Sequence, residues 1–257
     1  MSRVLLALQA CVFAAQAAVV EVDLIFPRND TYAPGPFMPV VFAIQNAAMA
    51  ASLDMVILWD IIQRADPGGP DRRSGIINLQ DFNMTAANPL FVENYAQRLN
   101  GTEDDWAVRF GLSFANCSKS AGGLTKVTRN SESRTLLFST KPGAPAPNLE
   151  QNPGKCVNST GVAINVADTL PIPLTELHMV NNDIDSCLVL ASPPTEEGNP
   201  CAVTLNETTA AGILGNYCGP DTAIPCLPAS SAPAQAIPIL VSWFLPMFAG
   251  LVLYLSV

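Results

Sequence analysis

The strongest constraint on the fold is the stretch 106–114, in which large apolar side chains alternate with small or charged ones. The apolar positions are Trp106, Val108, Phe110, Leu112 and Phe114. A period of two places these five side chains on one face of a β-strand. The stretch therefore predicts a half-buried antiparallel strand.

Six further stretches have strand character, and Pro- and Gly-rich turns lie between them. The strands are expected at 20–24, 40–44, 55–62, 135–140, 162–166 and 187–190, with turns at 34–36, 66–70 and 143–147. Seven short strands with almost no helical periodicity predict an all-β fold, an antiparallel immunoglobulin-like β-sandwich. Residues 64–103 show few strand patterns and are expected to form a long excursion. A Pro-rich loop is expected at 141–157 and one short helix at 208–214.

The N-terminus has the pattern of an export signal. Arg3 precedes an apolar run, and Ala15 and Ala17 supply the small residues that signal peptidase requires. Cleavage is expected after residue 17, so that the mature chain begins at Ala18. The alternative is an N-terminal membrane anchor, which is disfavoured because the run is short for a hydrocarbon core of about 30 Å.

The C-terminal residues 237–257 form a second apolar segment, 21 residues long and without charge. This length suits a membrane helix, but no Lys or Arg follows to fix its orientation. Small residues at 229–232 precede it, a pattern typical of a glycosylphosphatidylinositol (GPI) signal whose tail is removed. We expect attachment at Ser230 or Ser231. The short spacer through residue 236 weakens this interpretation, and a retained membrane span or a buried core helix are the alternatives.

The cysteine count indicates a disulfide framework. Cys11 lies in the signal, and six cysteines remain after export: Cys117, Cys156, Cys187, Cys201, Cys218 and Cys226. An even number in an exported chain predicts three disulfides, with the connectivity left open. The spacings do not match a zinc ligand set, so no metal site is expected. Attachment of the anchor at Ser230 or Ser231 keeps all six cysteines.

Six sequons predict N-glycosylation in an exported protein: Asn29, Asn83, Asn100, Asn116, Asn158 and Asn206. Asn116 is the weakest, because Cys117 occupies the middle position of its triplet and is expected to be bridged. The formal net charge is -9, and loss of Arg3 with the signal leaves 12 basic and 22 acidic residues. Such an acidic surface repels phosphate backbones, so no nucleic-acid partner is expected.

No combination of residues in the sequence indicates a particular enzymatic reaction. His178 is the only histidine, no Gly-x-Ser-x-Gly elbow is present, and we interpret it as an ordinary surface residue. Asp60, inside an apolar strand, and Asp104 with Asp105 are the candidates for acid/base work of the glycosidase type. The alternative for Asp60 is an ion pair with an arginine such as Arg109. No phosphate loop, dinucleotide fingerprint or calcium loop indicates a cofactor, and none is expected.

Sugar-binding modules use exposed aromatic side chains as stacking platforms. Trp59 and Trp106 fall in strand patterns and are expected in the core, because aromatic side chains in strands usually pack inward. Tyr32 and Tyr95 lie in loop-like contexts and are expected to be better exposed. Tyr217 completes the set of aromatic candidates.

The opening of the mature chain resembles a known family. The run Val20-Glu21-Val22-Asp23-Leu24-Ile25-Phe26-Pro27, followed by Pro39-Val40-Val41-Phe42-Ala43-Ile44-Gln45-Asn46, is similar to the start of an uncharacterised family of secreted fungal proteins. In that family a domain of unknown function follows the signal directly. The resemblance extends over about residues 20–226 and implies a fungal, exported protein, often with a C-terminal anchor signal. It implies no assigned activity and no catalytic residues.

These observations predict five segments and a non-enzymatic function. The segments are a signal peptide at 1–17, a β-sandwich at 18–192, a disulfide-stapled Cys-rich appendage at 193–228, a small-residue spacer at 229–236 and the hydrophobic tail at 237–257. The favoured hypothesis is a glycosylated fungal surface protein at the plasma membrane or cell wall, with a structural or contact role. Its expected partners are the membrane, through the anchor, and wall polysaccharide. The alternatives are a carbohydrate-binding or carbohydrate-active secreted protein and a soluble secreted effector.

Overall fold

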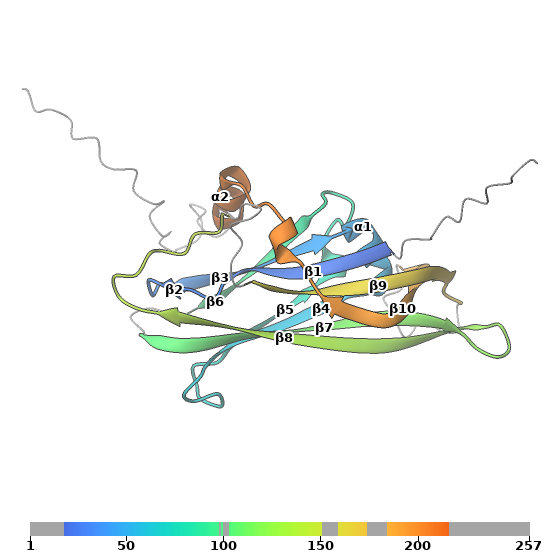
Figure 1. The fold of residues 1–257 in the computed structure, drawn as a ribbon, viewed down its shortest axis with the longest axis horizontal. Coiled ribbons are helices and arrows are strands. Elements are labelled where there is room, and N and C mark those ends of the chain that lie inside the picture. The colour runs from blue at the N-terminus through green and yellow to red at the C-terminus, as the bar shows by residue number, and fades with distance from the viewer. Residues whose placement is uncertain (1–17, 98, 100–102, 151–158, 174–183, 216–257) are drawn as a thin grey trace, which may run out of the picture. The chain divides into compact units, whose positions relative to one another are not determined.

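The computed structural model describes residues 18–97, 99, 103–150, 159–173 and 184–215, in which two five-stranded sheets form a β-sandwich (Figure 1). Sheet A has the order β10-β9-β1-β3-β6, and all its strand pairs are antiparallel. Its strands are β1 (Ala18–Phe26), β3 (Phe37–Gln45), β6 (Leu90–Gln97), β9 (Thr160–Pro171) and β10 (Ser186–Glu197).

Sheet B has the order β2-β8-β7-β4-β5. Its strands are β2 (Thr31–Tyr32), β4 (Val56–Gln63), β5 (Arg73–Asn78), β7 (Asp104–Lys119) and β8 (Thr125–Thr140). The pairs are antiparallel except that the two-residue β2 runs parallel to β8. The antiparallel β-sandwich expected from the sequence is therefore confirmed.

Alternating apolar residues of both sheets fill the space between them. Trp106, Val108 and Phe110 of β7 are almost fully buried, as the period-two pattern predicts. The ring of Phe110 meets that of Phe42 on β3 with their centroids 5.3 Å apart at an interplanar angle of 69°, so this edge contact joins the two sheets. All seven predicted strands are present, and the predicted helix is α2 (Glu207–Gly215).

The region 64–103 is where the sequence interpretation was wrong. We expected a long excursion, but the structure has β5 and β6 there, and each is the end strand of its sheet. An end strand pairs with a neighbour on one side only, and the sequences of these two strands show weaker apolar patterning. Gly75 interrupts the apolar pattern of β5, and the pattern of β6 contains two polar residues, Glu93 and Asn94.

The outer face of sheet A is covered by the C-terminal segment 198–215. This segment contains a short 3-10 helix, η4 (Pro200–Ala202), and α2, which lies on the side of sheet A away from β7 and β8 (Figure 1). Leu205 and Ile213 are buried in the same core cluster as the strands. The hydroxyl of Tyr95 on β6 donates a 2.9 Å hydrogen bond to the carbonyl of Ile213. Outward-facing residues of β1 and β3 such as Asp23 and Ala43 are therefore buried, whereas Leu58 and Ile76 on the outer face of sheet B are exposed.

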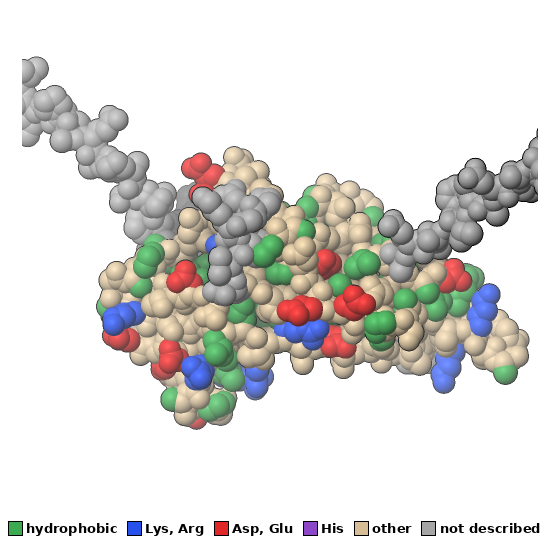
Figure 2. Space-filling view, in the orientation of Figure 1, with side chains coloured by type: hydrophobic (Ala, Val, Ile, Leu, Met, Phe, Trp, Pro, Cys, Tyr) green, Lys and Arg blue, Asp and Glu red, His purple; other side chains and the backbone are tan. Residues whose placement is uncertain are grey.

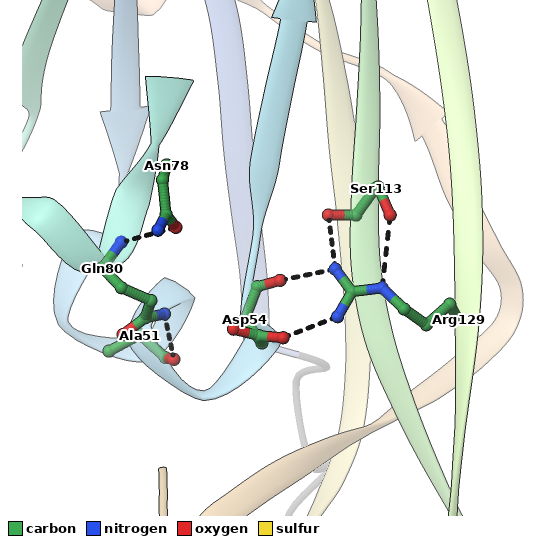
Figure 3. A network of polar contacts seen from close by, with 6 residues as sticks. All are labelled: Ala51, Asp54, Asn78, Gln80, Ser113 and Arg129. Carbon is green, nitrogen blue, oxygen red and sulfur yellow. Dashed lines mark hydrogen bonds and ion pairs between the residues drawn. The ribbon is translucent and has the colours of Figure 1, made fainter. Parts of the chain in front are cut away.

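A polar network fixes the point where β4 begins (Figure 3). Three short elements surround it: α1 (Ala47–Ala50), η1 (Ala51–Leu53) and η2 (Leu79–Asp81). Asp54 adopts a left-handed conformation with φ 44°, and its carboxylate accepts a 2.6 Å hydrogen bond from Nη1 of Arg129 on β8. Nη2 of the same arginine donates to the Asp54 carbonyl at 2.8 Å. Arg129 therefore clamps an uncommon backbone conformation, which a non-glycine residue rarely adopts without such support.

The expected boundary between sandwich and appendage falls inside a strand, because β10 continues through Pro193 to Glu197. The chain divides by its internal contacts after Leu227, and the second unit, Pro228–Val257, lies wholly outside the described residues. The proposed signal, spacer and hydrophobic tail also lie outside them. Among the described residues, no helix is both long and apolar enough to cross a membrane.

Candidate functional site

The outer face of sheet B carries two parallel rows of side chains that cross the strands. The first row follows the register Ser74–Asp60–Arg109 over β5, β4 and β7 and is polar. The second row crosses β5, β4, β7 and β8 in that order. Its residues on β5 and β4 are large and apolar, and those on β7 and β8 are small: Ile76, Leu58, Gly111 and Ser133. A charged strip and an apolar strip therefore lie side by side on one uncovered face.

Asp60 is held by two arginines. Its carboxylate accepts hydrogen bonds from Nε and Nη2 of Arg109 at 2.8 and 2.6 Å, and its Oδ2 lies 2.7 Å from Nη2 of Arg72. The side chain of Asp60 is only 8% exposed, whereas those of Arg72 and Arg109 are 56% and 46% exposed. Hydrogen bonding to Asp60 raises the pKa of Arg109 above its usual value. The predicted alternative for Asp60, an ion pair with Arg109, is confirmed.

A groove of about 670 Å³ lies over these rows, and we call it the sheet B groove. Its walls include Asp60, Arg72, Arg109, Leu58 and Ile76. Leu58 and Ile76 are 47% and 66% exposed and stand opposite each other on β4 and β5, so together they form an exposed aliphatic surface. Gly111 lines the groove between Leu58 and Ser133, so no side chain separates these two residues there. A β-carbon added at Gly111 would meet only the carbonyl oxygen of Glu132, at 3.7 Å, so the fold itself does not require glycine there.

A second depression of about 500 Å³ opens between the end strands β5 and β6, and we call it the edge depression. It shares Trp59, Arg72 and Ser74 with the sheet B groove. The indole of Trp59 lies directly beneath Gly75, because a β-carbon added there would stand 2.7 Å from three indole atoms. Trp59 Nε1 is buried, and within the described part of the chain it has no hydrogen-bond partner. A buried N–H donor without a partner is uncommon in native proteins.

The other acidic candidates lie apart from Asp60. Asp104 and Asp105 begin β7 and line a separate depression with Glu103. Asp104 accepts a 2.7 Å hydrogen bond from Gln63, and Asp105 accepts one of 2.7 Å from the Ser139 hydroxyl. The structure does not place either acid with Asp60 in one depression. His178 lies outside the described residues.

The expected exposure of two tyrosines was wrong. Tyr32 and Tyr95 are 5% and 8% exposed, because Tyr32 packs 5.0 Å from the Phe26 ring and Tyr95 lies under α2. Burial raises the pKa of Tyr32 to about 12. Trp59 and Trp106 are 3% and 1% exposed, as predicted for core residues. Tyr217 lies outside the described residues.

β1 carries a buried acid, Asp23, which its alternation with apolar residues does not predict. Asp23 is fully buried on the outer side of sheet A, under the segment that contains Gly198. Burial, and then the neighbouring Glu21, raise the pKa of Asp23 to about 8, while a 2.8 Å hydrogen bond from Gln45 Nε2 opposes the rise. Oδ1 of Asp23 would stand 2.0 Å from a β-carbon at Gly161 on β9, so only glycine fits there. Burial therefore favours the protonated form of this carboxyl. Its Oδ2 accepts from Gln45, whereas its buried Oδ1 has no hydrogen-bond partner within the described part of the chain.

The cysteines and sequons are partly described. Cys117 on β7 and Cys187 on β10 form a disulfide that joins sheet B to sheet A, and Cys201 is also disulfide-bonded. Cys156, Cys218 and Cys226 lie outside the described residues, as do Asn100, Asn158, Ser230 and Ser231. The sequon asparagines Asn29, Asn83 and Asn206 are exposed. Asn116 is half-buried, and its Oδ1 accepts a 3.1 Å hydrogen bond from the backbone of Leu190.

Charged side chains show no large area of one sign on the face seen in Figure 2, where acidic and basic groups are interspersed. Among the described residues, no group of three or more His, Cys, Asp or Glu side chains could hold a metal ion. Among the depressions described above, we take the sheet B groove as the candidate site. It combines an ion-paired acid, two arginines oriented by that acid and two exposed aliphatic side chains.

Comparison with protein families gives one match. The model of the family described as Domain of unknown function (DUF7136) matches residues 15–217. Comparison with curated proteins gave no match, and comparison with solved structures gave none. The matched range includes every strand of the sandwich and ends two residues after α2.

Proposed function

This chain belongs to the DUF7136 family, and on that footing we propose that it is a non-enzymatic, glycosylated protein of a fungal cell surface. In this proposal the chain is exported, trimmed at both ends and held by a GPI anchor at the outer face of the plasma membrane or in the wall. The rigid β-sandwich serves a structural or contact role there. The membrane and wall polysaccharide are its partners, and nucleic acid is not.

The observation that carries the proposal is the position of the sequons. Asn29, Asn83 and Asn206 are exposed, and none lies within a strand. Oδ1 of Asn206 accepts a 2.9 Å hydrogen bond from the backbone N–H of Thr209 and so caps α2. Glycosylation uses the amide nitrogen, so this cap is compatible with a glycan. Three accessible acceptors in a disulfide-bonded sandwich are typical of proteins made in the secretory pathway.

The engagement of the candidate acids supports a non-enzymatic role. Glycosidases need two carboxyl groups across one substrate, one of them able to give up a proton. Asp60 is fixed by two guanidinium groups, and Asp104 and Asp105 line a different depression. We therefore assign Asp60 a structural role, in which its carboxylate holds the side chains of Arg72 and Arg109 in place.

Release from intact cells tests the anchor. Phosphatidylinositol-specific phospholipase C should free the protein into the medium, and a variant with valine at both Ser230 and Ser231 should no longer be released this way. Digestion with peptide-N-glycosidase should lower the apparent mass of the released protein. Retention after both lipase treatment and wall digestion would instead support a retained membrane span.

A carbohydrate-binding role is the second candidate, and the sheet B groove favours it. The groove combines hydrogen-bonding groups with exposed aliphatic side chains, which suits an amphipathic sugar ring. If the groove hydrolysed a glycan through Asp60, Asp60→Asn would abolish the hydrolysis. Hydrolysis that survives this substitution would exclude Asp60 as the acid.

A further inference from the structure

We propose that the sheet B groove binds an acidic saccharide, an oligosaccharide that carries carboxylate groups. The inference deepens the contact role proposed above, on which its biological setting rests, by naming a ligand class and the residues that contact it. Arg72 and Arg109 contact a carboxylate of the ligand. Leu58 and Ile76 pack against the C–H face of a sugar ring.

The charge of the groove is opposite to that of the chain. The full chain has a formal net charge of -9, yet the charged groups that line the groove are one carboxylate and two guanidinium groups. Asp60 neutralises only one of the two arginines, so the cluster keeps a positive charge. Screening by water is lower in a groove than on an open surface, so this charge acts at short range on a bound anion.

Asp60 also leaves donors for a ligand. An arginine has five N–H donors in a fixed plane, and the bonds to Asp60 use Nε and Nη2 of Arg109 and Nη2 of Arg72. Both side chains are about half exposed and line the groove. Asp60 therefore orients two guanidinium groups in advance, which lowers the entropy lost when a carboxylate binds to them.

The neutral parts of the groove match a sugar better than a simple anion. Ser74 and Ser133 supply hydroxyl groups, while Leu58 and Ile76 supply exposed aliphatic surface in the adjacent row. A sugar ring has hydroxyls at its rim and C–H groups on its faces, so it can use both rows at once. Gly111 leaves space for the ring within the second row, between Leu58 and Ser133.

The edge depression extends the site around β5. Trp59, Arg72 and Ser74 line both hollows, so an extended ligand can cross this end strand from one to the other. Asn94 of β6 adds an amide to the wall of the edge depression. A chain of two or more sugar units suits this geometry better than a monosaccharide.

The test uses the secreted, processed protein and galacturonate oligomers of defined length in a calorimetric titration. Wild-type protein should bind the acidic oligomers and should not bind neutral glucose oligomers of the same length. Arg72→Gln should weaken binding about tenfold, because it removes one charged contact and leaves the pair between Asp60 and Arg109 in place. Gly111→Val should weaken binding by more than about tenfold, because the new side chain fills the groove where the fold has room for it.

Matched variants control for charge and for added bulk. Arg64→Gln removes an exposed arginine that follows β4 and does not line the groove. Its Nη1 lies 3.8 Å from the carboxylate of Asp105 on β7. Ser131→Val adds an aliphatic side chain at an exposed position of β8 that does not line the groove. Both should bind as the wild type does. Melting temperatures identify any variant that fails to fold, and Arg72→Gln keeps the test decisive if Gly111→Val does so.

Four results would overturn the inference: no binding of galacturonate oligomers, equal binding of neutral oligomers, unchanged affinity in Arg72→Gln, or unchanged affinity in folded Gly111→Val. Competition by polyglutamate as strong as that by galacturonate would assign the groove to acidic peptides and would also overturn it. None of these results affects release by the phospholipase, so failure of the groove and failure of the surface location are separate outcomes.

Discussion

The buried acid Asp23 should make the stability of the protein depend on pH, and Asp23→Asn should remove that dependence. Asp23 is fully buried between β1, Gly161 of β9 and the segment at Gly198, with Gln45 Nε2 donating to it at 2.8 Å. An asparagine has the shape of the protonated acid. Its oxygen can accept from Gln45, and its amide can donate toward Glu21, so the packing is kept.

The sign of the effect follows from the direction of the shift. Burial and Glu21 raise the pKa of Asp23 from 3.8 to about 8 in the folded protein. Between these two values the folded state holds a proton that the unfolded state has lost. The contribution of Asp23 to stability is therefore fully present below pH 3.8 and is lost as the pH rises through about 8.

The loss of stability with pH depends on two things: the pKa shift of Asp23, and how easily the segment that contains Gly198 opens to let water reach the carboxylate. Each pKa unit corresponds to about 1.4 kcal/mol, so a rise of about four units corresponds to about 5 to 6 kcal/mol. Local opening of the segment that contains Gly198 would admit water to the carboxylate at a smaller cost. We therefore expect the wild type to lose about 2 to 3 kcal/mol relative to Asp23→Asn between pH 5 and pH 9.

Urea unfolding of the wild type and of Asp23→Asn at unit steps of pH measures this difference. The exposed acid Asp81 provides a matched control, since Asp81→Asn should keep the pH dependence of the wild type. Parallel stability curves for the wild type and Asp23→Asn would refute the account of a protonated, buried Asp23. A wild type that gains stability relative to Asp23→Asn at pH 9 would refute it as well.

Three further predictions concern packing, covalent structure and glycosylation. Gly75→Ala should destabilise the fold by about 1 to 3 kcal/mol in urea unfolding, since the new β-carbon would overlap the indole beneath it; an unchanged midpoint would contradict that packing. Replacing Cys117 and Cys187 by alanine should lower the free energy of unfolding by about 3 to 4 kcal/mol, because the bond closes a loop with a sequence separation of 70 and joins the two sheets. A smaller loss than about 1 kcal/mol would indicate that packing alone holds the sheets together. Asn83→Gln should increase gel mobility by the mass of one glycan, whereas Asn116→Gln should not, because Asn116 is half-buried and bonded to β10; a shift only for Asn116→Gln would contradict the surface assignment.

The interior strands of the two sheets could be predicted from the sequence, because each contributes a full apolar face to the core. Trp106, Val108 and Phe110 illustrate this, since their period-two spacing alone determines which face is buried. The pairing of Asp60 with Arg109 was also open to sequence reasoning. An acid within an apolar strand needs a partner, and Arg109 lies in another strand with the same alternation.

Features that depend on distant segments could not be predicted. Asp23 alternates with apolar residues and so has the pattern of a solvent-facing position, but the segment around Gly198 covers it in space. The first ten residues of β8 are mostly polar, and their strand conformation comes from pairing with β7 across a tight hairpin. The sheet B groove depends on the pairing of Gly111 on β7 with Leu58 on the adjacent strand β4. A single glycine within a strand does not indicate which residue will lie opposite it.

Mass spectrometry of the protein purified from its native surface tests the central claim most directly, because it reads both ends of the mature chain and its modifications together. The account predicts an N-terminal peptide that starts at Ala18, a C-terminal peptide that ends at Ser230 or Ser231 with a glycolipid remnant, and glycans at Asn29, Asn83 and Asn206. A polypeptide that still runs from Met1 to Val257, without glycans and with free thiols, would contradict it.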